Sequence, residues 1–302
     1  MSEPARAPVR APARERRLVH LSDLHFGAHC DLAQMEAIED FLPALAPDAI
    51  LVSGDLSQRA RHGEYQAAHY FLSRLRQLAP VLVVPGNHDV QWWASPFHLR
   101  GARPLYDKFR IYFGEDLTPV LELPGLVVAG ALTAHGLAWG SMTWNLRDAT
   151  VKGHLPKRET DRVAEIFRRA APGTAKVLVM HHNVLPGKIS RRQGLARWQG
   201  AQRRLQALGA DVVLCGHDHQ EGAGQLGTTL AISSSGTHSS RMRGGRPSVF
   251  NLVRIDGSAV HIQHNRWEAA ARRFVPADSY AFARHQPAHP AVSVAGGDDP
   301  AL

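Results

Sequence analysis

Short apolar runs alternate with amphipathic helical patterns along most of this chain, and that alternation restricts its fold more than any other feature. The segment RLVHLSD (17–23) has the composition of a strand, and apolar residues recur every three to four positions in the helix expected after Asp31. The pattern repeats, with strands expected at 49–55, 81–87, 126–132, 176–182 and 211–219 and helices at 64–78, 157–170 and 199–208. Apolar runs without intervening helices follow at 228–236, 248–256 and 259–267. The order predicts a layered α/β fold with parallel strands, extended by antiparallel strands near the carboxyl end.

Most of these strands end in side chains that are able to bind a metal ion. The residues are Asp23 and His25, Asp55, Asn87 and His88, His181 and His182, and His217 and His219. Each motif alone is also explained as a turn, because Gly, Asn and Asp are ordinary turn residues. Ligands of open α/β sheets bind at the carboxyl ends of the strands, however. Five such motifs in succession therefore predict a single site at that edge.

The donor types narrow the choice of metal and of chemistry. Two divalent ions about 3.5–4 Å apart need a shared anionic ligand, and Asp55 is the natural bridge because its motif contains no other donor. Imidazoles together with oxygen ligands suit Mn, Fe, Co, Ni or Zn better than Mg²⁺. Such a pair provides an activated hydroxide and positive charge around phosphoryl oxygens. The motifs therefore favour phosphate chemistry.

Composition indicates one folded domain between two tails. The 302 residues are 44% hydrophobic and 21% charged, which is enough for a sizeable core. The formal net charge is +8, but the Pro-, Ala- and Arg-rich residues 1–16 contribute to it and are expected to form a mobile tail. A second mobile tail is expected over 276–302, which leaves 17–275 as the folded domain. The net charge is thus weak evidence that the protein binds nucleic acid, and no nucleic-acid partner is expected.

The sequence also predicts a cellular location. No apolar segment has the length of a signal-peptide core or of a membrane span. The two cysteines, Cys30 and Cys215, are far apart, which favours reduced thiols over a disulfide framework. A cytoplasmic protein without a transmembrane segment is expected.

The order of the five motifs resembles the calcineurin-like metallophosphoesterases. The motifs are Asp-x-His (23, 25), Gly-Asp (54, 55), Gly-Asn-His-Asp (86–89), His-His (181, 182) and Gly-His-x-His (216–219). The resemblance covers about residues 17–270 and implies a four-layer α/β/β/α sandwich with two mixed sheets, so that 17–275 is the catalytic domain. It implies two divalent ions (Mn, Fe or Zn, with Mn or Fe favoured). One ion would be held by Asp23, His25, Asp55 and His219, and the other by Asp55, Asn87, His181 and His217.

The resemblance also implies roles beside the metals. His88 would face the scissile phosphate together with Asn87, as the acid for the leaving group or as a transition-state donor, and Asp89 would orient His88. The chain departs from the family at Asn183, because proline usually follows the paired histidines. The choice of His181 over His182 therefore stays open. Residues 95–170 contain no family motif.

The segment GTHSSRMRGGR (236–246) is a candidate for further substrate contacts. His238 and Arg241 follow an expected strand, and arginine side chains match phosphate oxygens. We expect His238 and Arg241 to contact the substrate.

The segments HLSDLHFG (20–27) and SGDLSQRA (53–60) are most similar to the bacterial cyclic-nucleotide phosphodiesterase branch. This implies in-line attack of a metal-bridging hydroxide on a small phosphodiester, for example a 3′,5′-cyclic nucleotide. A related branch hydrolyses the pyrophosphate of a UDP-diacylglucosamine precursor of lipid A, and the apolar residues 95–125 could form the cap that a lipid needs. A non-catalytic scaffold of the same fold is a further alternative, although all the metal-binding motifs are present. A nuclease is less favoured, because no long basic and aromatic stretch accompanies the second motif.

Overall fold

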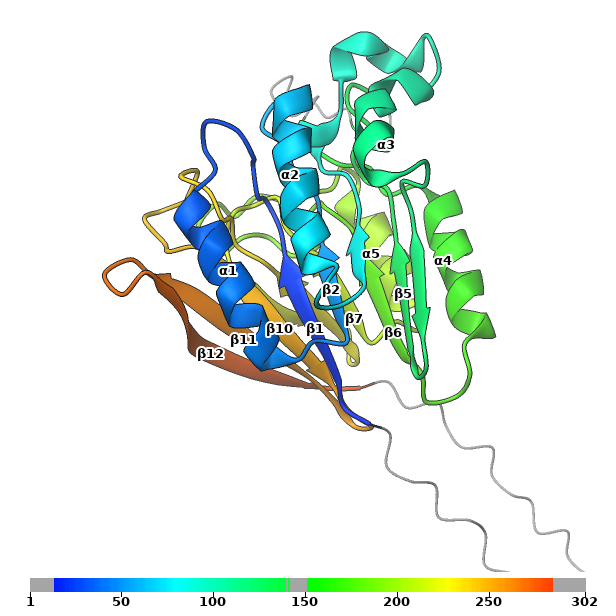
Figure 1. Cartoon of the computed structure of the whole chain (residues 1–302). Coiled ribbons are helices and arrows are strands. Elements are labelled where there is room, and N and C mark those ends of the chain that lie inside the picture. Colours follow the sequence, from blue (N-terminus) through cyan, green and yellow to red (C-terminus); the bar gives the residue numbers. More distant parts are fainter. Residues whose placement is uncertain (1–13, 140, 142–150, 285–302) are drawn as a thin grey trace, which may run out of the picture.

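The computed structural model describes residues 14–139, 141 and 151–284. Within these residues two six-stranded mixed sheets form the centre of the molecule (Figure 1). The first has the order β12 (Arg273–Ala283), β11 (Ala259–Glu268), β10 (Val249–Ile255), β1 (Arg16–Leu21), β2 (Ala49–Val52) and β3 (Val81–Val83). The second has the order β4 (Val120–Leu123), β5 (Leu126–Gly130), β6 (Ala175–Val179), β7 (Val212–Cys215), β9 (Leu230–Ser234) and β8 (Gly222–Leu226).

Helices cover the outer faces of both sheets. They are α1 (Leu32–Leu45), α2 (His62–Leu75), α3 (Asp107–Phe113), α4 (Lys157–Arg169) and α5 (Trp198–Gln206). Asp31 caps α1, because its carboxylate accepts hydrogen bonds from the backbone N–H groups of Ala33 and Gln34. Short 3₁₀ turns lie at Asn87–Asp89, Trp92–Ala94, Pro96–His98 and Arg103–Leu105.

Central strands are parallel and outer strands are antiparallel. In the first sheet β1, β2 and β3 run parallel, and β10, β11 and β12 add antiparallel to β1. In the second sheet β5, β6, β7 and β9 run parallel, with β4 and β8 antiparallel at the edges. The sequence analysis did not recognise β4 and β8, because these short strands are only partly buried and lack a clear apolar pattern.

Three apolar layers separate four layers of secondary structure. Helices α1 and α2 pack on the outer face of the first sheet through residues such as Ile38 and Leu72. The inner faces of the two sheets meet through residues such as Leu51 and Val177. Helices α4 and α5 pack on the outer face of the second sheet, where Phe167 is buried. The predicted α/β/β/α sandwich with two mixed sheets is confirmed.

The predicted C-terminal tail begins too early. Residues 276–283 belong to β12, which pairs with β11 on both sides of a register irregularity. Pro276 is tolerated because β12 is an edge strand, and the register is irregular next to the pair that Pro276 forms with Asn265. The Pro- and Ala-rich composition concealed a strand whose Phe274 and Phe282 pack on the core. The rest of that predicted tail, from 285 on, lies outside the described residues.

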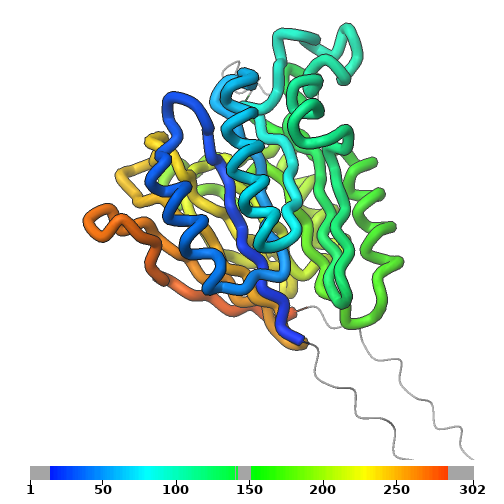
Figure 2. Tube along the Cα trace, viewed as in Figure 1, coloured from blue at the N-terminus to red at the C-terminus, as the bar shows by residue number. Residues whose placement is uncertain are grey.

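The predicted N-terminal tail ends close to the observed start of the fold. Arg16 is the first residue of β1, and the Arg14 and Arg16 guanidinium groups bond to Asp48 Oδ1 at 3.2 and 3.4 Å. Residues 1–13 lie outside the described residues. The start of β1 and the end of β12 lie at the same end of the molecule (Figure 2). The loops that carry the strand-end motifs lie at the opposite end.

None of the helices in the described part of the chain combines the length and the apolar character that a bilayer crossing requires. The thiols of Cys30 and Cys215 are free, and Cys215 is buried in the core. The cytoplasmic location stays a prediction.

Candidate metal centre

The ends of five strands bring the predicted metal-binding residues together. Asp23 and His25 follow β1, Asp55 follows β2, Asn87 and His88 follow β3, His181 follows β6, and His217 and His219 follow β7. His25 and His219, which are 194 positions apart, come within hydrogen-bond distance. The edge that the sequence pattern indicated is therefore a single site.

Five of these residues have a left-handed backbone conformation. The φ angles are +54° at Asp23, +47° at His25, +53° at Asp55, +72° at His217 and +55° at His219. Residues other than glycine adopt this region rarely, and it persists only where the surrounding structure enforces it. Several of the strained backbone conformations in the described residues therefore lie at this site.

Glycine allows the loops to approach each other closely. A Cβ atom on Gly86 would lie 2.1 Å from Asp55 Oδ1, and one on Gly216 would lie 2.3 Å from Asp23 Oδ2. No larger residue fits at either position without displacing a carboxylate. The glycines of the Gly-Asn-His-Asp and Gly-His-x-His motifs thus permit the close packing of the site.

One group of donors consists of Asp23, His25, Asp55 and His219. His25 Nε2 lies 3.1 Å from His219 Nε2, which lies 3.3 Å from Asp23 Oδ1. Asp55 Oδ2 lies 3.8 Å from His25 Nε2. These four side chains could hold one metal ion.

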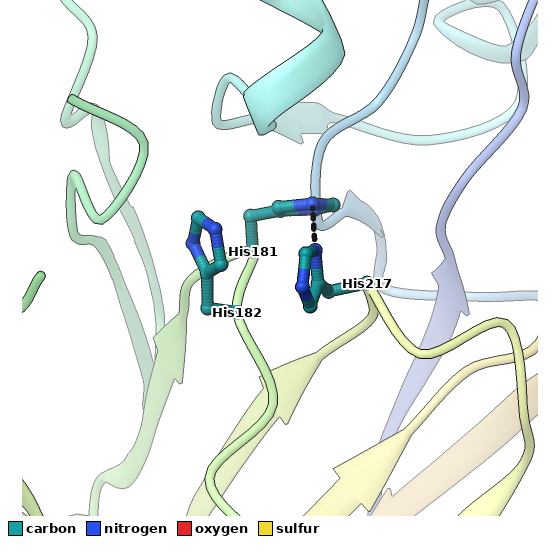
Figure 3. Close-up of side chains that lie close together, drawn as sticks. All are labelled: His181, His182 and His217. Carbon is teal, nitrogen blue, oxygen red and sulfur yellow. Dashed lines mark hydrogen bonds between the residues drawn. The ribbon is translucent and has the colours of Figure 1, made fainter. Parts of the chain in front are cut away.

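A second group forms around the side-chain oxygen of Asn87. His181 Nε2 and His217 Nδ1 lie 3.0 and 2.9 Å from Asn87 Oδ1, and the two nitrogens are 3.3 Å apart (Figure 3). Asp55 Oδ2 lies 3.4 Å from His181 Nε2, and the same oxygen approaches His25 in the first group. Asp55 therefore stands between the two groups, in the position that a bridging ligand requires.

The two adjacent histidines differ in their surroundings. The His181 Nδ1–H group donates to the backbone oxygen of Ser53 at 2.8 Å, which leaves Nε2 directed at the site. His182 Nδ1 lies 2.8 Å from Thr133 Oγ1, and its Nε2–H group donates to the backbone oxygen of Val151 at 3.0 Å. Both nitrogens of His182 are thus engaged outside the centre, although its ring lies beside His217 (Figure 3). The geometry favours His181.

Most donors are in the protonation state that metal binding requires. Burial lowers the pKa of His25 and of His217 to about 3, so both imidazoles are neutral near pH 7. Burial alone would raise the pKa of Asp23 and Asp55, but the neighbouring histidines hold both pKa values below the usual range. Burial lowers the pKa of His219, but the adjacent Asp23 outweighs it and raises that pKa. Neutral imidazoles and ionised carboxylates that converge in this way fit two divalent transition-metal ions.

His88 and Arg241 form a pair beside these groups. The His88 Nδ1–H group donates to the backbone oxygen of Gln58 at 2.8 Å, and an Arg241 Nη1–H group donates to His88 Nε2 at 2.9 Å. The backbone oxygen of Arg241 in turn accepts from His219 Nδ1 at 2.8 Å. Sequence analysis missed Gln58, because a residue that acts through its backbone leaves no side-chain signal.

Asp89 does not orient His88, so that prediction is wrong. The Asp89 carboxylate accepts from the backbone N–H groups of Leu56, Ser57 and Gly86 at 3.1, 2.9 and 2.9 Å, and from Ser57 Oγ at 2.9 Å. Burial and the nearby Asp55 raise the pKa of Asp89 to about 6. The fully buried Asp89 therefore joins the loops that follow β2 and β3.

The prediction that His238 contacts the substrate is also wrong. Its side chain is fully buried, and its ring packs edge-on against Phe274 with 5.8 Å between the ring centres. Phe274 belongs to β12, the strand that the sequence analysis took for part of a tail. The segment after β9 thus turns His238 inward, whereas Arg241 reaches the site.

A cavity of about 560 Å³ opens beside both donor groups. Among the residues that line it are Asp55, Asn87, His88, His217 and His219, together with Lys152, Arg191, Arg192, Arg241 and Arg243. Residues 95–125, the predicted lipid cap, contribute nothing to its described walls. The excess of positive side chains favours an anionic substrate.

A four-layer sandwich that joins two groups of His, Asp and Asn donors at its strand ends defines a metallophosphoesterase with a candidate dinuclear metal centre. Residues 16–221 match the family model described as calcineurin-like phosphoesterase. The chain belongs to this family, and it is a hydrolase of phosphoric esters.

Similar proteins agree with this assignment. The chain is 36% identical over 227 residues to a glycerophosphodiester phosphodiesterase, GpdQ, of Enterobacter lignolyticus, a match that covers 67% of this chain and 70% of the relative. A dimetal phosphatase from Danio rerio has the same fold, with a TM-score of 0.62 and 10% identity over 91% of this chain and 100% of that one. A purple acid phosphatase from yellow lupin (Lupinus luteus) has a TM-score of 0.62 and 11% identity over 90% of this chain, which spans only 54% of the lupin protein.

Proposed function

We propose that this enzyme hydrolyses a small phosphodiester with two divalent transition-metal ions. The observation that carries the proposal is the pair of donor groups that Asp55 Oδ2 approaches from one side chain and that border a cavity rich in arginine. The 36% identical relative named as a glycerophosphodiester phosphodiesterase supports a diester over a monoester. The lipid alternative receives no support, because the apolar segment 95–125 does not line the described cavity.

The ligand assignment follows from the two groups. Asp23, His25, Asp55 and His219 would hold one ion, and Asp55, Asn87, His181 and His217 would hold the other. When bound, such ions supply an activated water and positive charge near the phosphoryl oxygens. The histidine rings are already oriented, because His181 and His219 each donate an Nδ1–H to a backbone oxygen.

The chain itself contributes charge and orientation. Arg241 and His88 border the cavity and touch each other, so a phosphoryl oxygen bound beside them contacts both. The guanidinium group donates to a phosphate through fixed N–H groups. Gln58 holds the His88 ring from the opposite side, which limits rotation of the imidazole. We assign these two side chains to the binding of the phosphoryl group and to the departure of the leaving oxygen.

The first test compares metal dependence and substrate class. Chelated protein should be inactive and should regain activity with Mn²⁺, with a metal content close to two ions per chain. The reloaded enzyme should hydrolyse bis-p-nitrophenyl phosphate faster than p-nitrophenyl phosphate, and 3′,5′-cyclic AMP should be compared with a UDP-linked lipid in the same series. Full activity after exhaustive chelation, or a clear preference for the monoester, would contradict the proposal.

The second test concerns the shared ligand. Asp55→Ala should lose more activity than Asn87→Ala, because one Asp55 oxygen approaches both groups of donors. Excess Mn²⁺ should partly restore the Asn87 variant and leave the Asp55 variant inactive, with metal content measured in parallel. Equal losses that metal does not relieve would remove the bridging role from Asp55.

A further inference from the structure

We propose that the preferred diester carries a second phosphate, and that Arg191 and Arg192 bind it. This inference rests on the proposed phosphodiesterase function and extends it to the class of substrate. Both arginines line the same cavity as the metal donors, and both are exposed. They belong to the segment 184–197 between β6 and α5, which we call the arginine loop.

Asn183, the residue just before the arginine loop, anchors the loop through hydrogen bonds. This buried residue stands where the family usually has proline, and its Nδ2 group donates to the backbone oxygens of Leu185 and Arg192 at 2.7 and 3.1 Å. Proline has no side-chain donor and is unable to make either bond. A Cβ atom on Gly194 would lie 2.2 Å from Asn183 Oδ1, so the loop wraps closely around the asparagine. The departure from the family pattern therefore shapes the loop that carries the two arginines.

The loop is also tied to the Gly-His-x-His motif. Ser190 Oγ donates to Asp218 Oδ2 at 2.8 Å, and the backbone N–H of Ile189 donates to Gln220 Oε1 at 2.8 Å. Asp218 lies between the two proposed ligands His217 and His219 in the chain. These bonds hold the arginine loop at a defined position next to the metal donors.

A third set of bonds holds the end of the loop that leads into α5. Gly153 N–H donates to the backbone oxygen of Gly194 at 2.9 Å, and Ala196 N–H donates to the backbone oxygen of Gly153 at 2.8 Å. Arg191 itself has a left-handed backbone with φ of +54°. The loop is thus an organised structure, which reduces the ordering cost of binding an anion there.

The charges of the cavity exceed what a single phosphodiester group requires. Arg243 is paired with Asp218, with Nη1 and Oδ1 3.2 Å apart, and Arg241 lies beside His88. In the described part of the chain, no carboxylate forms an ion pair with Arg191 or Arg192. Two arginines that line one cavity and form no ion pair with a carboxylate of the described residues favour a ligand with at least two negative charges, which a phosphate monoester provides.

The remaining wall suits the organic part of such a substrate. The Trp198 side chain lines the cavity at the start of α5. It is half-buried and packs on the apolar layer between the second sheet and the helices α4 and α5. An indole face packs against a sugar or a base, while arginine contacts the phosphate. The cavity thus combines the metal donors, the two arginines and an indole side chain. A nucleotide-like or sugar-like diester with a second phosphate matches these three features.

Two substrates that differ by one phosphate test the proposal. They are thymidine 5′-(p-nitrophenyl phosphate) and its 3′-phosphorylated counterpart, which release the same chromophore. The Mn²⁺-loaded enzyme should prefer the 3′-phosphorylated substrate by about tenfold or more in kcat/KM, as expected for hydrogen bonds to a charged group. The R191Q/R192Q variant should lose this preference and retain its activity on the simple diester. The control variant R168Q/R169Q removes two neighbouring arginines from exposed positions on α4. It should keep the preference for the 3′-phosphorylated substrate.

Binding provides a readout that is independent of turnover. Titration calorimetry on the chelated full-length chain should show tighter binding of thymidine 3′,5′-bisphosphate than of thymidine 5′-monophosphate, and the R191Q/R192Q variant should bind both alike. An unchanged preference in that variant, or no preference in the unmodified enzyme, would overturn the second-phosphate site. Failure to hydrolyse either diester would instead contradict the proposed function, while the calorimetric comparison would still decide the role of the arginines.

Discussion

Individual residues at the candidate centre are held by contacts that their own sequence positions do not reveal. Asp23, His25, Asp55, His217 and His219 adopt left-handed conformations that the packing of neighbouring loops enforces. The sequence identified them correctly as residues that meet at a strand edge, because motif order and strand ends are local features. The choice between His181 and His182 needed their hydrogen-bond partners, which are Ser53 just after β2, Thr133 in the loop after β5, and Val151.

The histidine pair leads to a prediction at the residue scale. His181→Ala should lose close to one metal ion per chain and most activity, because His181 Nε2 points at Asn87 and Asp55. His182→Gln should keep the full metal content, since both its ring nitrogens bond elsewhere. Metal analysis of the two purified variants, with circular dichroism to verify folding, makes the comparison. Metal loss confined to the His182 variant would reverse our assignment.

At the scale of elements, β12 shows how composition misled the interpretation of the carboxyl end. The strand is long and pairs with β11 near both of its ends, but it contains a proline and several small residues that are typical of a tail. Its stability comes from pairing and from burial of Phe274 and the partial burial of Phe282, which depend on the neighbouring strand and on α1. β-Propensity reflects such surroundings more than the residues themselves.

Two truncations test the role of β12. A chain that ends at residue 275 should be less stable by at least about 2 kcal/mol, because β11 loses its hydrogen-bonded neighbour and Phe282 is removed. A chain that ends at residue 284 keeps the whole strand and should match the full-length protein in urea denaturation. If both truncated chains unfold at the same urea concentration as the full-length protein, the strand contributes nothing to stability.

At the scale of the whole molecule, several buried histidines make stability depend on pH. Outside the proposed ligands, burial is the main cause that lowers the pKa of His20 and His238 to about 3 and of His135 and His264 to about 4. In the unfolded chain these groups titrate near pH 6.5, so between that pH and their folded pKa the unfolded state binds more protons. Stability is therefore lost as pH falls through this window. The raised pKa values of the Asp89, Asp218 and Glu39 carboxyl groups act in the opposite direction.

Chemical denaturation of the chelated protein between pH 7 and 5 should reveal this loss. Each such histidine contributes up to about 1.4 kcal/mol per pH unit, and His264→Gln should reduce the slope by about that amount. His264 is suitable because it lies on β11, which β10 separates from β1, and bonds to Asn251 on β10, where glutamine keeps a polar side chain. A slope that is equal in the variant and the parent protein would show that His264 is not neutral in the folded state.

The sequence by itself determined the layered α/β class, the family, and the strand ends at which the metal donors lie. It could do so because apolar periodicity and short motifs are local properties of the chain. Only the tertiary structure decided which side chains meet. It turned His238 into the core beneath β12, gave Asp89 four hydrogen-bond donors from two loops, and placed Gln58 behind His88. It also brought Arg191 and Arg192, from a segment without a recognised motif, to the cavity beside the metal donors. These contacts join residues that are distant along the chain, so their geometry depends on how the two sheets and their loops pack together.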